Sequence, residues 1–123
     1  RQKNLAPASI GPEPQGSLAG GWLFVSGHLG LKPATGENVG EEFGDQTRQA
    51  LENFRTIIEP AGFAVTDVVA VDVFITDMAQ FSVFNNIYAE VFSEHKPARA
   101  VVEVKGLPRG GRVEVKCTAF RGA

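Results

Sequence analysis

Residues 45–76, DQTRQALENFRTIIEPAGFAVTDVVAVDVFIT, change from a helical period to a strand period and so decide the class of fold. In the first part, small and apolar side chains recur at alternating steps of four and three: Thr47, Leu51, Phe54, Ile58 and Ala61. Charged side chains take the opposite side. Pro60 removes a backbone donor and Gly62 permits a left-handed residue, so the pattern stops there. We expect one amphipathic helix between Asp45 and Gly62.

Residues 68–76 alternate with a period of two, which predicts a β-strand. One face is uniformly branched and consists of Val69, Val71, Val73 and Ile75. The other face is mixed and consists of Val68, Ala70, Asp72, Phe74 and Thr76. This pattern is typical of a strand that is buried on one side and partly buried on the other.

The flanking sequence predicts one more helix and two hairpins. Asp77 and Gln80 resemble a capping box, and apolar residues continue at helical spacing, so a second helix should run to about Glu94. Gly20-Gly21 is a turn signal between Leu18 and the strand at 22–25. Residues 98–104 and 112–120 alternate on either side of a turn at 106–111, which predicts a closing hairpin.

The predicted order β-β-α-β-α-β-β is typical of the α+β class, with one sheet of mixed strands and both helices packed on one face. Residues 1–16 are rich in proline and glycine, so we expect an irregular N-terminal arm. Two helices cannot cover both faces of such a sheet. The second face should therefore be covered by another copy of the chain, which predicts a homo-oligomer.

Length and composition exclude several classes of protein. The chain has 123 residues, of which 43% are hydrophobic and 21% charged, so we expect a single globular domain over 1–123. A net charge of −2 provides no long-range electrostatic attraction for a polyphosphate chain and disfavours nucleic acid as a partner. No apolar run could span a membrane. The single cysteine, Cys117, fits a reducing compartment, so cytoplasmic localisation is expected.

Motifs for nucleotide, metal or local triad chemistry are missing from the sequence, so we expect an activity that needs no cofactor and no metal. The residue that points to chemistry is Arg99, which begins a strand among apolar neighbours. A guanidinium there is either a clamp for a small organic acid or half of an ion pair with Glu103 or Glu114. By pattern alone Glu114 is a solvated strand residue, Cys117 a core thiol and His28 a loop histidine.

Seven segments in one collinear order carry a resemblance to a known family. They are Ile10-Gly11-Pro12, Phe24–Gly27, Gln46–Asn53, Val73–Asp77, Asn85–Tyr88, Lys96–Arg99 and Val113–Val115. The sequence resembles the Rid family, also called YjgF/YER057c/UK114, from about Ala8 to Phe120. The resemblance implies a chorismate-mutase-like protomer, a homotrimer with clefts at the subunit interfaces, and hydrolytic deamination of 2-iminobutanoate, 2-iminopropanoate and similar reactive intermediates to 2-oxo acids and ammonia.

The resemblance also implies roles for individual residues. Arg99 matches the arginine that binds the substrate carboxylate, and Glu114 matches the glutamate that orients or activates the attacking water. Substrate-binding positions are Ser26, Gly27, His28, Asn85, Pro108 and Glu13. The family commonly has glutamine at position 28 and tyrosine at position 13. A carboxylate at position 13 would oppose an anionic substrate unless it is paired or turned outward, so we expect a preferred imine that differs from the standard ones.

Three alternatives remain at this point. The chain could sense 2-oxo acids through Arg99 without turnover, or deaminate a larger, aminomuconate-like enamine. An endoribonuclease activity, attributed to some relatives, is disfavoured by the acidic balance of the chain.

Overall fold

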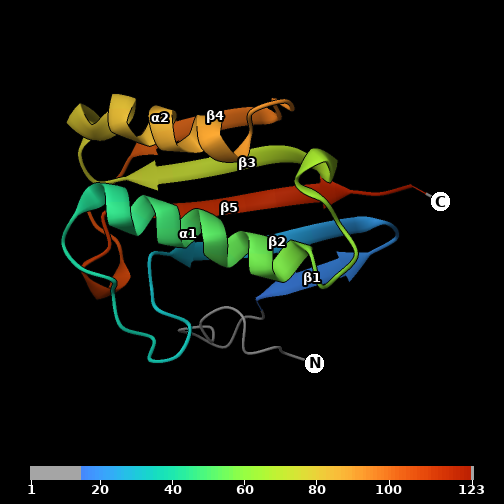
Figure 1. The fold of residues 1–123 in the computed structure, drawn as a ribbon, viewed down its shortest axis with the longest axis horizontal. Coiled ribbons are helices and arrows are strands. Elements are labelled where there is room, and N and C mark those ends of the chain that lie inside the picture. The colour runs from blue at the N-terminus through green and yellow to red at the C-terminus, as the bar shows by residue number, and fades with distance from the viewer. Residues whose placement is uncertain (1–14, 123) are drawn as a thin grey trace.

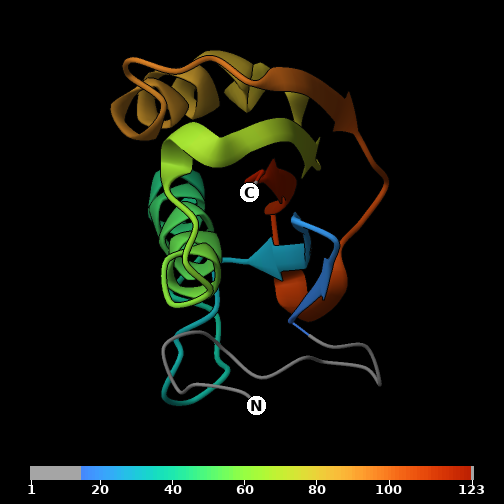
Figure 2. The same ribbon diagram turned by 90° about the vertical axis from the view of Figure 1, so that its right-hand side faces the viewer.

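The computed structural model describes residues 15–122, which fold in the predicted order of strands and helices (Figure 1). The strands are β1 (Gly16–Ala19), β2 (Trp22–Leu29), β3 (Val68–Ile75), β4 (Ala98–Glu103) and β5 (Val113–Phe120). The helices are α1 (Phe43–Ile58) and α2 (Phe81–Val91), and short 3₁₀ turns lie at Val65–Asp67, Met78–Gln80 and Pro108–Gly110. Both helices lie on the same side of the curved sheet (Figure 2). The predicted α+β class is confirmed.

The order of strands in the sheet is β1-β2-β5-β3-β4, so the predicted closing hairpin is wrong. β3 lies between β4 and β5, and β4 runs parallel to β3 with Val71 opposite Arg99. The physical reason is the helix between β3 and β4, because a strand, a helix and a second strand form a crossover that makes the two strands parallel. The apolar β3 takes a central place, and β4, which carries Arg99 and Glu103, takes the edge.

The β1–β2 hairpin is confirmed, and Gly20 and Gly21 adopt the positive φ values of 54° and 89° that its turn requires. Its first strand begins at Gly16, so the expected irregular arm is wrong for that residue. Gly16 pairs with Val25, and this pairing makes it part of the sheet. The rest of the predicted arm, up to residue 14, lies outside the described residues.

β3 departs from simple alternation at its start. A shift of register between Val68 and Ala70 places Val68 in the core and leaves Val69 41% exposed. Val69 therefore does not join the buried face with Val71 and Val73, as the sequence pattern predicted. An irregularity of this kind adds a residue to one strand and reverses the facing of the side chains before it.

The helices begin and end close to the predicted residues. α1 begins two residues early, at Phe43, because the Glu42 side chain accepts a hydrogen bond from Gly44 N at 3.1 Å. The second predicted helix is split. Asp77 caps the 3₁₀ turn at Met78–Gln80 by accepting from Ala79 N at 3.0 Å, and α2 then ends at Val91, three residues before the expected end.

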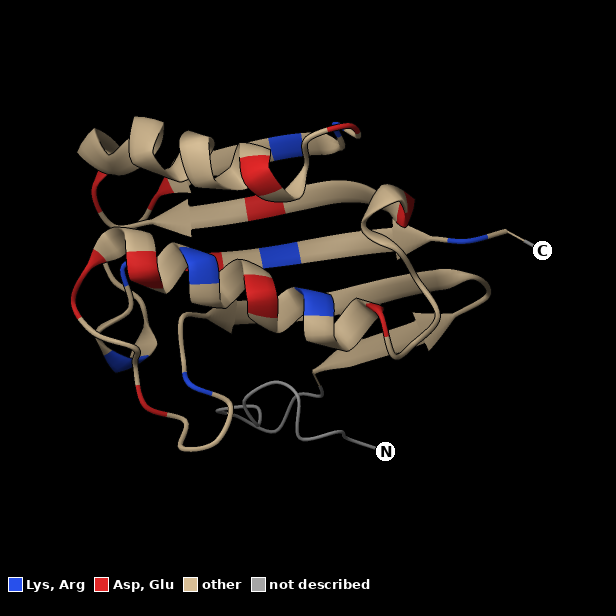
Figure 3. Cartoon of the chain, in the orientation of Figure 1, with Lys and Arg blue, Asp and Glu red and all other residues tan. Residues whose placement is uncertain are grey.

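The core lies between the helices and the inner face of the sheet. Its fully buried members include Phe54 and Leu51 of α1, Phe84 of α2, Val73 of β3 and Val115 of β5. Positively and negatively charged residues alternate along α1 (Figure 3), and Arg55 forms an ion pair at 3.2 Å with Glu59 at the end of the helix. This helix therefore presents a mixed charged surface rather than a basic stripe.

The sheet face away from the helices, here called the outer face, carries exposed aromatic residues. Trp22 and Phe120 pair across β2 and β5 with ring centroids 4.6 Å apart, and Phe24 lies next to Trp22 along β2. Trp22 is 41% exposed and Phe24 49% exposed. Within the described chain, these rings have water rather than protein over much of their surface, which is typical of a surface that associates.

Candidate functional site

Arg99 lies near the start of the edge strand β4 with its side chain directed toward α2. Its Nη1 donates a hydrogen bond to Asn85 Oδ1 at 2.8 Å. The guanidinium carbon lies 4.8 Å from the ring centroid of Tyr88 and 5.9 Å from that of Phe81. Within residues 15–122, neither Glu103 nor Glu114 forms an ion pair with Arg99, so the structural ion pair considered from the sequence is not formed.

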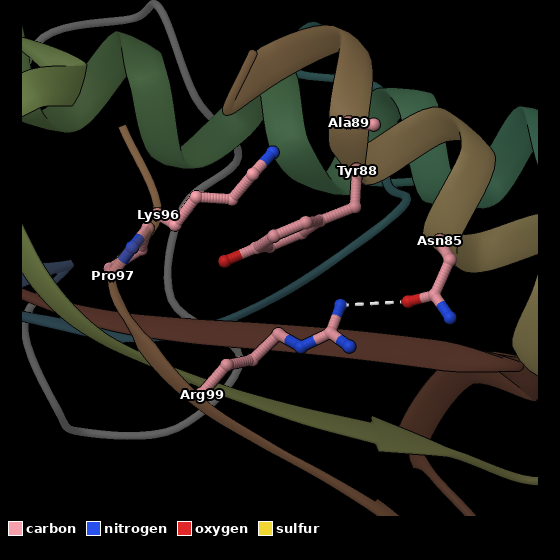
Figure 4. Close-up of a pocket in the computed structure, with 6 residues that line it drawn as sticks. All are labelled: Asn85, Tyr88, Ala89, Lys96, Pro97 and Arg99. Carbon is pink, nitrogen blue, oxygen red and sulfur yellow. Dashed lines mark hydrogen bonds between the residues drawn. The ribbon is translucent and has the colours of Figure 1, made fainter. Parts of the chain in front are cut away.

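A hollow of about 290 Å³ lies beside this guanidinium, between α2 and the start of β4. It is lined by Asn85, Tyr88, Ala89, Lys96, Pro97 and Arg99 (Figure 4). Two of these residues are cations and none is a carboxylate. The ammonium of Lys96 donates a hydrogen bond to Phe92 O at 3.2 Å. An aromatic floor with two cations at its rim suits a small organic anion.

Tyr88 forms the floor of the hollow and is only 7% exposed. Burial raises the pKa of Tyr88 to about 12, while the neighbouring charge of Arg99 opposes that rise. The hydroxyl therefore stays protonated at neutral pH. Among the described residues it has no hydrogen-bond partner, so Tyr88 contributes its ring rather than its hydroxyl to the surroundings of Arg99.

Glu114 lies on β5 between Val113 and Val115, which face the helices, so its side chain is on the outer face. It is packed tightly against Gly27 of β2. A Cβ atom at position 27 would lie 2.6 Å from Glu114 Oε2, and only glycine leaves room for the carboxylate there. The structure therefore brings the predicted residues Gly27 and Glu114 together.

The same chain keeps Arg99 and Glu114 apart. Arg99 pairs with Val71 of β3 from one side, and Glu114 pairs with Phe74 of β3 from the other. Two strand spacings and three residues along the sheet separate their Cα atoms by roughly 14 Å. Their side chains also lie on opposite faces, so one copy of the chain cannot present both groups to one small molecule.

The other two predicted site residues of β2, Ser26 and His28, differ in their burial. Ser26 is half-buried at the shift of register, and its backbone N–H donates to Gln15 O at 3.0 Å. His28 was expected in a loop, which is wrong, because it belongs to β2 and is 7% exposed. Burial lowers the pKa of His28, and a hydrogen bond to the Gln15 backbone opposes this change. Among the described residues, its Nε2 has no partner.

The remaining predicted site residues fall in separate places. Asn85 lines the hollow and contacts Arg99 directly. Pro108 is exposed in the 3₁₀ turn between β4 and β5 and is not part of that hollow. Glu13 lies outside the described residues. Cys117 is a core thiol, as predicted, and burial raises its pKa to about 12.

Four residues of the hollow were not predicted as site residues, namely Tyr88, Ala89, Lys96 and Pro97. Asn85 and Tyr88 are three residues apart on one helix, and this spacing places them on the same face. The signal was present in the sequence, but Tyr88 also fits the apolar stripe of α2, so it was assigned to the core.

The fold and the hollow define a class of small α+β protein. In this class an edge strand carries an arginine, and a neighbouring helix lines a hollow of the size of a small organic anion. Residues 3–121 match the family model described as Endoribonuclease L-PSP. A RutC family protein of Pyrococcus horikoshii is 45% identical over 116 residues, which cover 94% of this chain and 92% of that protein.

Two further relatives carry more specific names. The 2-iminobutanoate/2-iminopropanoate deaminase of Bos taurus is 40% identical over 117 residues, which cover 95% of this chain and 85% of the relative. The crystal structure of Escherichia coli TdcF with bound serine matches with a TM-score of 0.92 and 37% identity, covering 98% of this chain and 97% of that one. The chain belongs to the Rid (YjgF/YER057c/UK114) family.

In the described part of the chain, no helix has the length and apolar character needed to cross a membrane.

Proposed function

We propose that the chain is a cofactor-independent deaminase that hydrolyses 2-imino acids and their enamine tautomers, of the 2-iminobutanoate and 2-iminopropanoate type, to 2-oxo acids and ammonia. The observation that carries the proposal is the Arg99 guanidinium at the rim of a hollow that no carboxylate lines. Relatives at 36–40% identity are named for this activity, and a structurally similar chain binds serine, a small molecule with one carboxylate.

The chemistry asks little of the protein. Arg99 binds the substrate carboxylate and draws electron density from the adjacent C=N bond. Water adds to the C2 carbon, and Glu114 accepts a proton from that water as the new C–O bond forms. That proton passes to the nitrogen and gives a carbinolamine. The proton of its hydroxyl group then moves to the nitrogen as the C–N bond breaks and the C=O bond forms, so that ammonia and a 2-oxo acid leave. One water is consumed for each ammonia released, so no oxidant or cofactor enters the balance.

The assembly follows from the placement of the two groups on opposite faces of one sheet. We propose a homotrimer with clefts at the subunit interfaces, in which Arg99 of one copy and Glu114 of a neighbouring copy face one substrate. The exposed rings of Trp22, Phe24 and Phe120 on the outer face support association, since burial of such surface stabilises an interface.

One observation favours a second candidate, a sensor of 2-oxo acids. The hollow beside Arg99 is built by one chain and lacks Glu114, so it could bind a carboxylate without catalysing a reaction. The two candidates differ in turnover. A sensor would gain thermal stability with 2-oxobutanoate yet leave the lifetime of an imine unchanged.

The test uses 2-iminobutanoate made in situ from threonine by a threonine dehydratase, with semicarbazide present to trap the imine that escapes hydrolysis. We expect the protein to lower the yield of semicarbazone and Arg99→Ala to abolish that effect. Arg55→Ala, which removes an arginine of the α1 surface, is the matched control and should behave like the parent. Unchanged activity in Arg99→Ala would contradict the assignment. Cleavage of a labelled single-stranded RNA without imine hydrolysis would favour the endoribonuclease named by the family model.

A further inference from the structure

The Arg99 guanidinium is restrained on two sides by residues of α2. Asn85 accepts from its Nη1 at 2.8 Å, and the ring centroid of Tyr88 lies 4.8 Å from its central carbon. Figure 4 shows the guanidinium beside the Asn85 amide and next to the Tyr88 ring. A long arginine side chain on an exposed edge strand has many rotamers, and the two contacts remove most of that freedom.

We propose that Asn85 and Tyr88 are positioning residues, which hold the Arg99 guanidinium with its Nε–Nη2 edge free for a carboxylate. This inference rests on the proposed function, because it assigns the orientation of the group that would bind the substrate. Asn85 then acts through Arg99, to which its carbonyl oxygen is hydrogen-bonded.

The free edge follows from the donor inventory of arginine. A guanidinium has five N–H donors, and the hydrogen bond to Asn85 uses one of those on Nη1. Nε–H and one Nη2–H point in parallel along the other side of the group. A carboxylate binds such an edge with two parallel hydrogen bonds, which fix its orientation as well as its position.

Tyr88 contacts Arg99 through its aromatic ring. Its hydroxyl is buried and has no partner among the described residues, so it cannot be the group that orients Arg99. The face of an aromatic ring attracts a guanidinium, which is itself planar. Phenylalanine at this position should therefore serve as well as tyrosine, and an aliphatic residue should not.

The experiment measures two quantities on the full chain, the affinity for 2-oxobutanoate by calorimetric titration and the KM and kcat for 2-iminobutanoate made in situ. We expect Asn85→Ala to weaken 2-oxobutanoate binding and raise KM by about tenfold, with kcat within about twofold of the parent. Asn86→Ala, an exposed neighbour on the same helix, is the matched control and should change neither quantity. Tyr88→Phe should retain the parent's affinity, and Tyr88→Leu should lose about as much as Asn85→Ala.

A structural role alone would give a different pattern. If the two residues only supported the fold, the affinities of Tyr88→Phe and Tyr88→Leu for 2-oxobutanoate would follow the thermal stabilities of these variants. Asn85→Ala would also weaken binding further when combined with Arg99→Ala. We expect no further loss in that double variant, because Asn85 acts through Arg99. Equal affinity in Asn85→Ala and the parent, or equal loss in Tyr88→Phe and Tyr88→Leu, would overturn the proposal.

A third measurement needs no ligand. The Nε–H order parameter of Arg99, from nuclear magnetic resonance relaxation, should be high in the parent and fall in Asn85→Ala, while the Arg55 signal stays the same. An unchanged Arg99 order parameter would overturn the proposal even if Tyr88→Leu fails to fold. Absence of imine hydrolysis in the parent would refute the proposed function, and the order parameter and the titration would still decide the role of Asn85.

Discussion

Gly27→Ala tests whether the position of the Glu114 carboxylate matters for turnover. The added Cβ would lie 2.6 Å from Glu114 Oε2 and 2.8 Å from its carboxyl carbon. The carboxylate must therefore move by about 0.8 Å before ordinary van der Waals contact is restored. The group that moves is the end of a flexible side chain, so the free energy of unfolding should fall by only about 1 kcal/mol.

The effect on catalysis should be much larger than the effect on stability. A displacement of about 1 Å in a catalytic group lowers a rate by roughly 100-fold, so we expect kcat for 2-iminobutanoate to fall by about that factor. KM should change little, because Arg99 is untouched. The assay combines semicarbazone kinetics with urea denaturation, and Gly106→Ala, where an added Cβ meets nothing within 4 Å, is the control. A parent-like kcat in a folded Gly27→Ala protein would refute the role assigned to Glu114.

Two further predictions concern stability. Tyr88→Phe removes a buried hydroxyl that has no partner among the described residues, so the free energy of unfolding should rise by about 1 kcal/mol in urea denaturation at fixed protein concentration; a fall would mean that the hydroxyl is satisfied. His28 has its pKa lowered by burial, so the folded state binds fewer protons than the unfolded state as the pH falls below the ordinary value of 6.5. The parent should therefore lose more stability than His28→Gln between pH 7 and pH 5, and equal losses would contradict the assignment.

The class of fold follows from sequence period alone. The helix at 43–58 and the strand at 68–75 are each marked by spacing of apolar residues, and the signals that end them, such as Gly62, are local. The pairing of β4 with β3 is not local. It depends on the crossover through α2, and the alternation of residues 98–104 fits a hairpin and a parallel edge strand equally well.

The site is predictable in part for the same reason. Arg99 is conspicuous because a cation begins an apolar strand, but the partner that orients it lies 14 residues earlier on α2. The separation of Arg99 and Glu114 on opposite faces depends on the order of strands. That order cannot be derived from the alternation of single strands, so the separation of the two groups within one copy emerges only from the sheet.

Mixing two inactive variants would decide whether Arg99 and Glu114 of different copies serve one substrate. Arg99→Ala and Glu114→Gln, each inactive alone, are unfolded together and refolded as mixed oligomers. In a random mixture at equal amounts, about one site in four combines an intact Arg99 from one copy with an intact Glu114 from its neighbour, so about a quarter of the parent's imine hydrolysis should return. No recovery in mixed oligomers of parent-like size would show that the two groups do not meet across an interface.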